Sequence, residues 1–526
     1  KGGGVFARSM KRIPLSAQMR GALGVEAKEL EPDQLIAAIL RAPVDLIWFG
    51  GIGTYIKAAG ENHVEVGDRA NDALRVDARD VRARVIGEGA NLAVTQAGRI
   101  EYALLGGEGG GRINTDFIDN SAGVDSSDNE VNIKIALAPA RRAGRLADKR
   151  REALLQSMTE EVARIVLEDN RLQTLALSQA EAGGARAVAS QMRLIETLEE
   201  LGELDRRTDG IADNEALARR SADGHGLTRP ELAVLLSNGK LALQDAIEAS
   251  SCAQDEALVP LLLEAFPEQM RGSWRKDILA HRLRREIVAT KLANKVINRL
   301  GLIHPFELAE EEGTGLGAIA CAFVCAEHLL EVDAIWTAID RSAMNETARL
   351  LLLEHVAMAM RGQMSDVLRA GAATQNPSEL VGELQKGVTQ LREASEALLK
   401  PEVRAHTARL RTSFTEAGAP ERIADMVAQL FDMDGAIGLA RLAVDTGVSP
   451  VTLTRAFTDL GARLGLDWAQ STASVMAPSD PWERLLVGGL ARDFQQMRLD
   501  FLRALVKKRA SKADPAGAVA DWASAN

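Results

Sequence analysis

The sequence predicts an α/β fold followed by an all-α region. Residues 1–140 contain short apolar runs that end in Gly-rich turns and alternate with helical segments, which is typical of a parallel sheet. From about residue 141 onward the strand signals fade, and apolar residues recur at helical spacing. We therefore expect an α/β part over residues 1–140 and one or two all-α domains over residues 141–526.

Composition restricts the class of protein. Of the 526 residues, 46% are hydrophobic and 26% charged, which excludes disordered, collagenous and low-complexity chains. The uncharged run Gly315–Ala326 is far shorter than the roughly 18 residues of a membrane span. This run therefore predicts a protein without a membrane segment. The three cysteines are too few for a disulfide framework, which favours a reducing cytoplasm.

The charge argues against nucleic-acid binding. The net charge is −11, and residues 1–140 carry 16 basic and 19 acidic residues, which leaves 47 and 55 for the remainder. Neither part is basic, as a surface that binds phosphates would be. The segment Asp445–Arg455 resembles the turn and second helix of a helix-turn-helix, but Arg455 is nearly its only basic residue. A structural helix pair is the simpler interpretation.

The α/β part begins with a helix and continues with three strands. Glu31–Gln34 opens the apolar periodic stretch Leu35–Leu40, as a helix start with Pro32 in its first turn does, and Ala42-Pro43 ends this predicted helix. Apolar runs then predict strands over 44–49, 83–86 and 111–118. Each run ends in a turn rich in Gly or Asn, and these turns are Gly50–Gly53, Gly87–Asn91 and Asp119–Gly123.

These turns form the expected ligand site. In parallel sheets ligands bind beyond the carboxyl ends of the strands. Amide and hydroxyl groups that could hold a nicotinamide or a small carboxylate cluster in or near the turns, from Asn91, Asn120, Ser126 and Ser127. Neither Gly51-Ile52-Gly53 nor Gly87-Glu88-Gly89 has the third glycine of a G-x-G-x-x-G fingerprint, so plain loops are the alternative.

Two clusters could suggest a metal, and we predict none. The first is acidic, but it lacks the calcium-loop pattern, and helix capping and solvation explain it more simply; its members are Asp116, Asp119, Asp125, Asp128 and Glu130. The second consists of Cys321, Cys325 and His328 at i, i+4 and i+7. Its apolar neighbours favour a buried core helix, in which thiols act as small hydrophobes.

The helical region carries two further motifs. Thr228-Arg229-Pro230-Glu231 is a capping box with Pro in the first turn, and it predicts a helix through the apolar run that follows. The stretch His281–Glu286 predicts the start of a basic helix, which is either solvated or part of an interface with another subunit.

Several strings together resemble the large NAD-specific glutamate dehydrogenases of bacteria. They occur in the right order along nearly the whole chain, and they are Gly2–Phe6, Arg12–Ser16, Asp45–Tyr55, Gly87–Leu92, Gly111–Asp116, Asp119–Asp125, Leu227–Leu236 and Leu283–Ile287. The resemblance implies part of a Rossmann-like, parallel-sheet NAD-binding domain plus a large helical C-terminal region. It also implies oxidative deamination of L-glutamate to 2-oxoglutarate and ammonium, with NAD⁺ as cofactor and a homo-oligomeric assembly.

The resemblance also assigns site residues. Glu88–Asn91 is similar to the E-G-A-N turn of smaller glutamate dehydrogenases, which implies that Asn91 lies beside the nicotinamide. Asn120–Val124 is similar to their N-A-G-G-V turn near the nicotinamide and substrate, and Ser127 falls where a serine contacts a substrate carboxylate. We therefore expect substrate contacts from Ser127 and Val124, and cofactor contacts from Gly50, Gly51, Asn91, Asn120 and Gly123. From the residues alone, Ser127 could instead cap a helix.

No catalytic residue is assigned to this chain. The family's catalytic lysine and aspartate, and its Gly-rich pyrophosphate turn, match nothing here, so they are expected upstream. Because the chain opens with Lys1 and the family's members are several times longer, we interpret it as a C-terminal portion that is inactive alone. The alternative hypothesis is a non-catalytic oligomerisation or regulatory module.

Overall fold

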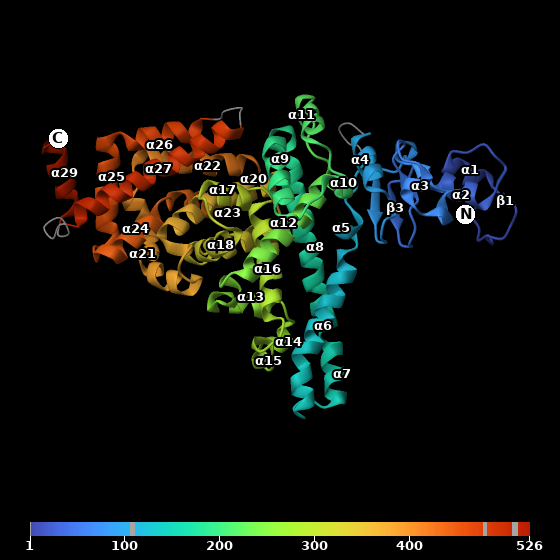
Figure 1. Cartoon of the computed structure of the whole chain (residues 1–526), viewed down its shortest axis with the longest axis horizontal. Coiled ribbons are helices and arrows are strands. Elements are labelled where there is room, and N and C mark those ends of the chain that lie inside the picture. Colours follow the sequence, from blue (N-terminus) through green and yellow to red (C-terminus); the bar gives the residue numbers. More distant parts are fainter. Residues whose placement is uncertain (1, 106–110, 477–480, 508–513, 526) are drawn as a thin grey trace. The chain divides into compact units, whose positions relative to one another are not determined.

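The computed structural model describes residues 2–105, 111–476, 481–507 and 514–525 (Figure 1). Contacts divide the chain into two compact units. Unit 1 comprises residues 1–239 and 265–281, and unit 2 comprises residues 240–264 and 282–526. Small sheets occur early in unit 1, and helices make up most of the rest, so the prediction of α/β followed by all-α is confirmed at this level.

Unit 1 holds the strands and the site. Its elements are β1 Ile13–Pro14, α1 Ala17–Leu23, β2 Glu29–Leu30, α2 Pro32–Leu40, β3 Leu46–Phe49, β4 Ile56–Lys57, α3 His63–Val66, η1 Arg69–Asn71, β5 Val76–Asp77, η2 Ala78–Asp80, β6 Val85–Glu88, α4 Gln96–Leu104, α5 Asp116–Asp119, α6 Ser121–Arg142, α7 Asp148–Ser157, α8 Thr159–Ala182, α9 Gly184–Glu200, α10 Arg206–Asp209, α11 Asn214–Ala222, the first part of α12 Arg229–Ala249, α14 Glu268–Arg271 and α15 Arg275–Leu279.

Unit 2 is helical throughout the residues that are described. Its elements are the second part of α12, η3 Cys252–Gln254, η4 Glu256–Leu258, α13 Val259–Glu264, α16 Arg284–Leu300, α17 His304–Glu311, α18 Leu316–Leu330, α19 Val332–Arg341, α20 Glu346–Val367, η5 Leu368–Ala372, α21 Pro377–Leu398, α22 Pro401–Glu416, α23 Glu421–Asp432, α24 Ala436–Thr446, α25 Pro450–Leu464, α26 Leu466–Val475, α27 Pro481–Val506 and α29 Pro515–Ala525.

The described strands form three two-stranded sheets. β3 pairs with β6 and β4 with β5, both in parallel, whereas β1 and β2 are antiparallel. A core cluster that includes Phe49, Ile56, Ile86, Val94 and Tyr102 packs between these strands and α4. Burial of such side chains stabilises a fold by about 1.5–3 kcal/mol each.

Two predicted strands are confirmed, and the third is wrong. β3 and β6 overlap the runs 44–49 and 83–86 that predict strands, and α2 lies where the helix is predicted, before Ala42-Pro43. Over 111–118, only Arg112 pairs with a strand, through a parallel bridge to Val85, and the chain turns into α5 at Asp116. The acidic residues of this segment disfavour a strand but suit the first turn of a helix.

The structure locates the three motifs predicted in the helical region: the capping box, the basic helix, and the cluster of two cysteines and a histidine. α12 begins at Arg229, as the capping box predicts, and it contributes residues to both units. The basic helix begins at Arg284, three residues later than expected, because His281 lies buried against Phe266, with ring centroids 5.8 Å apart. The thiols of Cys321 and Cys325 are buried in α18, which confirms the core interpretation, whereas His328 is exposed.

No single helix in the described ranges is long and apolar enough to cross a membrane. α17 and α18, bent by 109° with respect to each other, satisfy the length and composition test only when they are taken together.

Candidate functional site

Two of the predicted turns leave the sheet at the same edge. In the parallel pairing of β3 and β6, Phe49 lies opposite Glu88, so the strands end side by side. Gly50 follows the first strand and Gly89 the second. Arg112, bonded to the backbone of Arg84 and Ile86, adds a third segment beside β6. The Gly- and Asn-rich segments therefore meet at one edge, as expected for a parallel sheet.

An exposed aromatic ring covers the glycines of the second turn. Trp48 of β3 is 60% exposed, and a Cβ atom at Gly87 or Gly89 would lie 2.5 Å or 2.6 Å from an atom of its indole ring. These glycines are therefore required by contact with Trp48. From the sequence, this turn was an incomplete dinucleotide fingerprint or a plain loop. The role of Trp48 was missed, because its position on the open face of β3 depends on register.

A buried ion pair lies beneath this turn. Glu88, the last residue of β6, is fully buried, and Arg99 of α4 donates to both of its carboxylate oxygens, at 2.7 Å and 2.9 Å. Arg99 also donates to Asp116, at 2.8 Å. Burial raises the pKa of the Glu88 carboxyl group, and the hydrogen bonds and charge of Arg99 act in the opposite direction. Arg99 could not be found from the sequence, because its partners Glu88 and Asp116 lie 11 and 17 positions away along the chain.

Carboxylates fix the backbone of the turn. Glu88 accepts from the N–H of Val94 at 3.0 Å, Asp116 accepts from the N–H of Leu92 at 2.9 Å, and Asp119 accepts from the N–H of Glu88 at 2.9 Å. Leu92 has a φ of 55°, a left-handed conformation that costs a side-chain-bearing residue roughly 1–2 kcal/mol. Two of the five acids that were assigned to capping and solvation, Asp116 and Asp119, therefore hold a strained turn in place.

Asn91 and Asn120 lie together at the exposed end of this framework. Asn120 Nδ2 donates to Asn91 Oδ1 at 3.0 Å. Asn91 is exposed, and Asn120 occupies the junction between α5 and α6. A Cβ atom at Gly123 would lie 3.3 Å from Asn120 Oδ1, so glycine leaves room for this amide. The structure thus brings together three of the predicted cofactor residues.

Val124 and Ser127 extend along one face of α6. Asn120 is the N-cap residue, and positions 120, 124 and 127 have the i, i+4, i+7 spacing of one helix face. Both Val124, at 63% exposure, and Ser127 are exposed. Ser127 therefore does not cap the helix. The predicted turn ends at Asn120, because the segment from Ser121 onward is already helical.

The first turn is less constrained. Gly50 and Gly51 are exposed, and a Cβ atom at either position would have no neighbour within 4 Å, so the fold does not require glycine there. Gly53, which ends the predicted turn but was not assigned to the site, has a φ of 141°, and a Cβ atom there would lie 2.7 Å from Asn71 Nδ2 and 2.8 Å from the ring of Tyr55. Glycine is therefore needed for the backbone at residue 53, whereas residues 50 and 51 leave the main chain open to a ligand.

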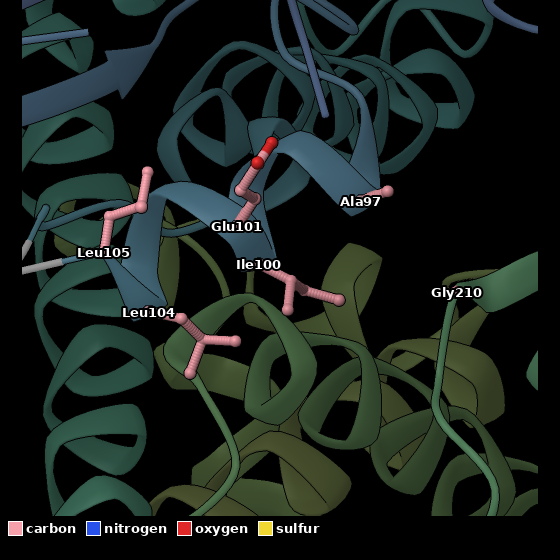
Figure 2. Close-up of a pocket in the computed structure, with 6 residues that line it drawn as sticks. All are labelled: Ala97, Ile100, Glu101, Leu104, Leu105 and Gly210. Carbon is pink, nitrogen blue, oxygen red and sulfur yellow. The ribbon is translucent and has the colours of Figure 1, made fainter. Parts of the chain in front are cut away.

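A separate groove lies on the outer face of α4 (Figure 2). It has a volume of about 430 Å³, and it is lined by Ala97, Ile100, Glu101, Leu104, Leu105 and Gly210. The carboxylate of Glu101 accepts a hydrogen bond from the N–H of Ala59, at 2.7 Å. Since Arg99 and Tyr102 face the opposite, buried side of α4, this groove is distinct from the turn that carries Asn91.

Two family models match this chain. Residues 1–180 match the family model "Bacterial NAD-glutamate dehydrogenase, catalytic domain", and residues 224–526 match "Glutamate dehydrogenase, C-terminal". The chain is thus an α/β segment of a dehydrogenase catalytic domain, followed by that family's helical C-terminal region.

Curated relatives make the family specific. The chain is 34% identical to the NAD-specific glutamate dehydrogenase of Halomonas elongata over 528 residues, which cover 100% of this chain and 32% of that protein. It is 36% identical to the proteins of the same name from Pseudomonas aeruginosa and Mycobacterium tuberculosis, over 92% of this chain and 30% of each relative. The chain belongs to the bacterial NAD-specific glutamate dehydrogenase family and spans about a third of the length of these relatives.

Proposed function

We propose that the full-length protein that contains this chain oxidises L-glutamate to 2-oxoglutarate and ammonium with NAD⁺. Residues 1–140 would form the C-terminal part of a Rossmann-like NAD-binding catalytic domain, and residues 141–526 its helical region. The observation that carries the proposal is the hydrogen-bonded pair of Asn91, which follows β6 of the parallel pair β3–β6, and Asn120, which lies between α5 and α6. The names of the relatives support the choice of substrate and cofactor.

The residues present fit the nicotinamide end of NAD. Two side-chain amides provide both donors and acceptors, which match the carboxamide of a nicotinamide. The backbone at Gly50 and Gly51 is open, and the exposed indole of Trp48 adds an apolar surface nearby. When bound, the nicotinamide ring supplies the acceptor for the hydride that leaves Cα of glutamate. We assign Gly50, Gly51, Asn91, Asn120 and Gly123 to contacts with this cofactor.

Val124 and Ser127 are assigned to the substrate. The Ser127 hydroxyl is exposed on the α6 face that begins at Asn120, and a hydroxyl can donate to a carboxylate of glutamate. The side chain of Val124 lies between Asn120 and Ser127 on the same face of α6, and it offers an apolar contact to the substrate's methylene groups. Holding the carboxylate and the methylene chain orients Cα toward the cofactor.

We further propose that the protein works as a homo-oligomer in the cytoplasm, with no nucleic-acid partner. The buried, unpaired cysteines suit a reducing compartment. The other candidate is a non-catalytic oligomerisation or regulatory module, which the extent of the helical region favours.

Glutamate-dependent NADH formation by the full-length protein tests the proposal. We expect Asn91→Ala, Asn120→Ala and Ser127→Ala each to lower kcat/KM by about tenfold or more, since each removes a contact to a ligand. Ser157→Ala is the matched control, because Ser157 is an exposed helical serine that donates to its own helix at Leu154 O. A wild-type protein without this activity would support the non-catalytic candidate. Unchanged turnover in Asn91→Ala and Ser127→Ala would refute the site assignment.

A further inference from the structure

The first residue of α12 reaches back to the α/β part of unit 1. Arg229 is mostly buried, and its Nε donates to Asn114 Oδ1 at 2.8 Å. The rest of its guanidinium contacts α8, through Glu181 at 2.9 Å, Ser178 at 3.1 Å and the carbonyl of Thr174 at 3.3 Å. These contacts hold the guanidinium in one orientation, aimed at Asn114.

Asn114 transmits this contact to the candidate site. Its Nδ2 donates to Asp119 Oδ1 at 2.8 Å, and Asp119 Oδ2 accepts from the N–H of Glu88 at 2.9 Å. Three hydrogen bonds in series thus connect Arg229 with the first residue of the Asn91 turn. Asp119 also immediately precedes Asn120, so the same series reaches both members of the amide pair.

We propose that Arg229 is a positioning residue that fixes the Asn91 turn by setting the orientation of the Asn114 amide. An Asn side chain has a carbonyl oxygen and an NH₂ group of nearly the same shape, and either can point toward Asp119. Arg229 can only donate, so it holds the Asn114 oxygen and leaves the NH₂ group for the carboxylate. Without Arg229 the amide can turn its oxygen toward Asp119, which repels that carboxylate and weakens its bond to Glu88.

The start of α12 is itself firmly held. The carboxylate of Glu231 accepts from the N–H of Thr228 at 2.8 Å, from its hydroxyl at 2.7 Å and from Arg220 at 2.8 Å. Glu231 is buried, so this capping box is shielded from water. Residues 224–526 match the C-terminal family model, so the first turn of that region supports a turn of the part matched by the catalytic model. The functional consequence of this support rests on the proposed function.

Amide hydrogen exchange in the full-length protein tests the positioning directly. We expect Arg229→Ala to raise exchange at the Glu88 and Leu92 amides by about tenfold, the effect of losing one to two hydrogen bonds. Arg206→Ala is the matched control, because Arg206 is similarly buried and contacts Glu199 and the carbonyl of Ala212, both at 3.0 Å. It should leave these two amides unchanged. Equal exchange in the two variants would overturn the proposal.

Two further measurements separate positioning from folding. Arg229→Lys keeps the charge but loses the planar fork, so it should give an intermediate increase in exchange even if Arg229→Ala does not fold. In the enzyme assay, Arg229→Ala should raise KM for NAD⁺ and lower kcat, whereas Arg206→Ala changes neither. If the wild-type protein forms no NADH, the proposed function fails, yet the exchange data still decide the role of Arg229. Wild-type exchange at both amides in Arg229→Lys would also contradict the proposal.

Discussion

Each unit contains a cluster of arginine and carboxylate side chains, and the two clusters differ in which groups their carboxylates bind. In unit 1, Arg99 pairs with Glu88 and Asp116, whose oxygens also accept N–H groups from an exposed turn. In unit 2, Arg361 donates to Glu307 at 2.9 Å and Glu311 at 2.5 Å. The first cluster therefore ends on the main chain of a turn, and the second on side chains of neighbouring helices.

The unit 2 cluster continues through two more arginines. Arg492 of α27 donates to Glu311 at 2.7 Å, and Arg369 of η5 donates to Glu312 at 3.2 Å. These contacts join α17, α20, η5 and α27. Similar residues therefore have separate structural roles: in unit 1 they fix the backbone of an exposed turn, and in unit 2 they hold helices together. Variants that break each cluster test this separation.

The largest effect is expected at Arg99. Arg99→Met leaves the buried Glu88 carboxylate without its cation, which should destabilise unit 1 by about 3–5 kcal/mol. The loss of stability is measured by chemical denaturation in which unfolding is monitored through hydrogen exchange of peptides from residues 84–105. Arg84→Met is the control, because Arg84 is 81% exposed and should contribute little. Equal stability of the two variants would show that the pair does not hold the turn.

Arg361→Met tests the second cluster. Removing the contacts to Glu307 and Glu311 should destabilise unit 2 by about 2–4 kcal/mol, because both carboxylates are largely buried. Since this cluster serves helix packing, KM for NAD⁺ of the full-length enzyme should stay within about twofold of wild type. Thermal denaturation and steady-state kinetics measure the two effects. A large rise in KM with unchanged stability would abolish the distinction between the clusters.

The pH dependence of unit 2 gives a third test. Burial raises the pKa of Asp366 from 3.8 to about 8, and the charge of Asp434 acts in the same direction. Between these values the folded form holds a proton that the unfolded form has lost, so the free energy of unfolding falls as pH rises, by at most about 1.4 kcal/mol per pH unit. Asp366→Asn should flatten this dependence in melts from pH 4 to 8. Asp459→Asn, at an exposed pair with Arg463, should not.

The smallest effect is expected where Trp48 covers the turn. A Cβ atom in Gly89→Ala would lie 2.6 Å from Trp48 Cζ2, so the exposed indole must shift, at a cost of about 1–2 kcal/mol. Denaturant unfolding measures the loss, and the double variant Trp48→Leu/Gly89→Ala should recover most of it. Full stability of Gly89→Ala alone would mean that the ring does not constrain this glycine.

The sequence predicted the features that depend on local pattern. Capping residues and runs of apolar side chains predict where α2, β3 and β6 lie and where α12 begins. The proximity of Asn91 and Asn120 was expected from parallel strands that end at one edge, but Asn120 follows the short helix α5 and not a third strand. The local pattern predicted a strand over residues 111–118, and this prediction was wrong. There Asp116 and Asp119 accept hydrogen bonds from the N–H groups of Leu92 and Glu88, which lie far away along the chain.

The residues that fix the turn carrying Asn91 could not be predicted from local sequence pattern. The contacts Arg99–Glu88, Asn114–Asp119 and Arg229–Asn114 join residues 11, 5 and 115 positions apart, and no local pattern in the sequence indicates them. Trp48 likewise acquires its role only from the register of β3 against β6. Such contacts arise from tertiary packing, which one sequence does not specify by spacing alone.

The most direct test is a structure of the full-length protein with NAD⁺ and 2-oxoglutarate bound. We predict that the nicotinamide carboxamide lies within hydrogen-bonding distance of Asn91 or Asn120, and that a substrate carboxylate lies beside Ser127. A nicotinamide ring bound elsewhere, with these three side chains facing solvent, would contradict it.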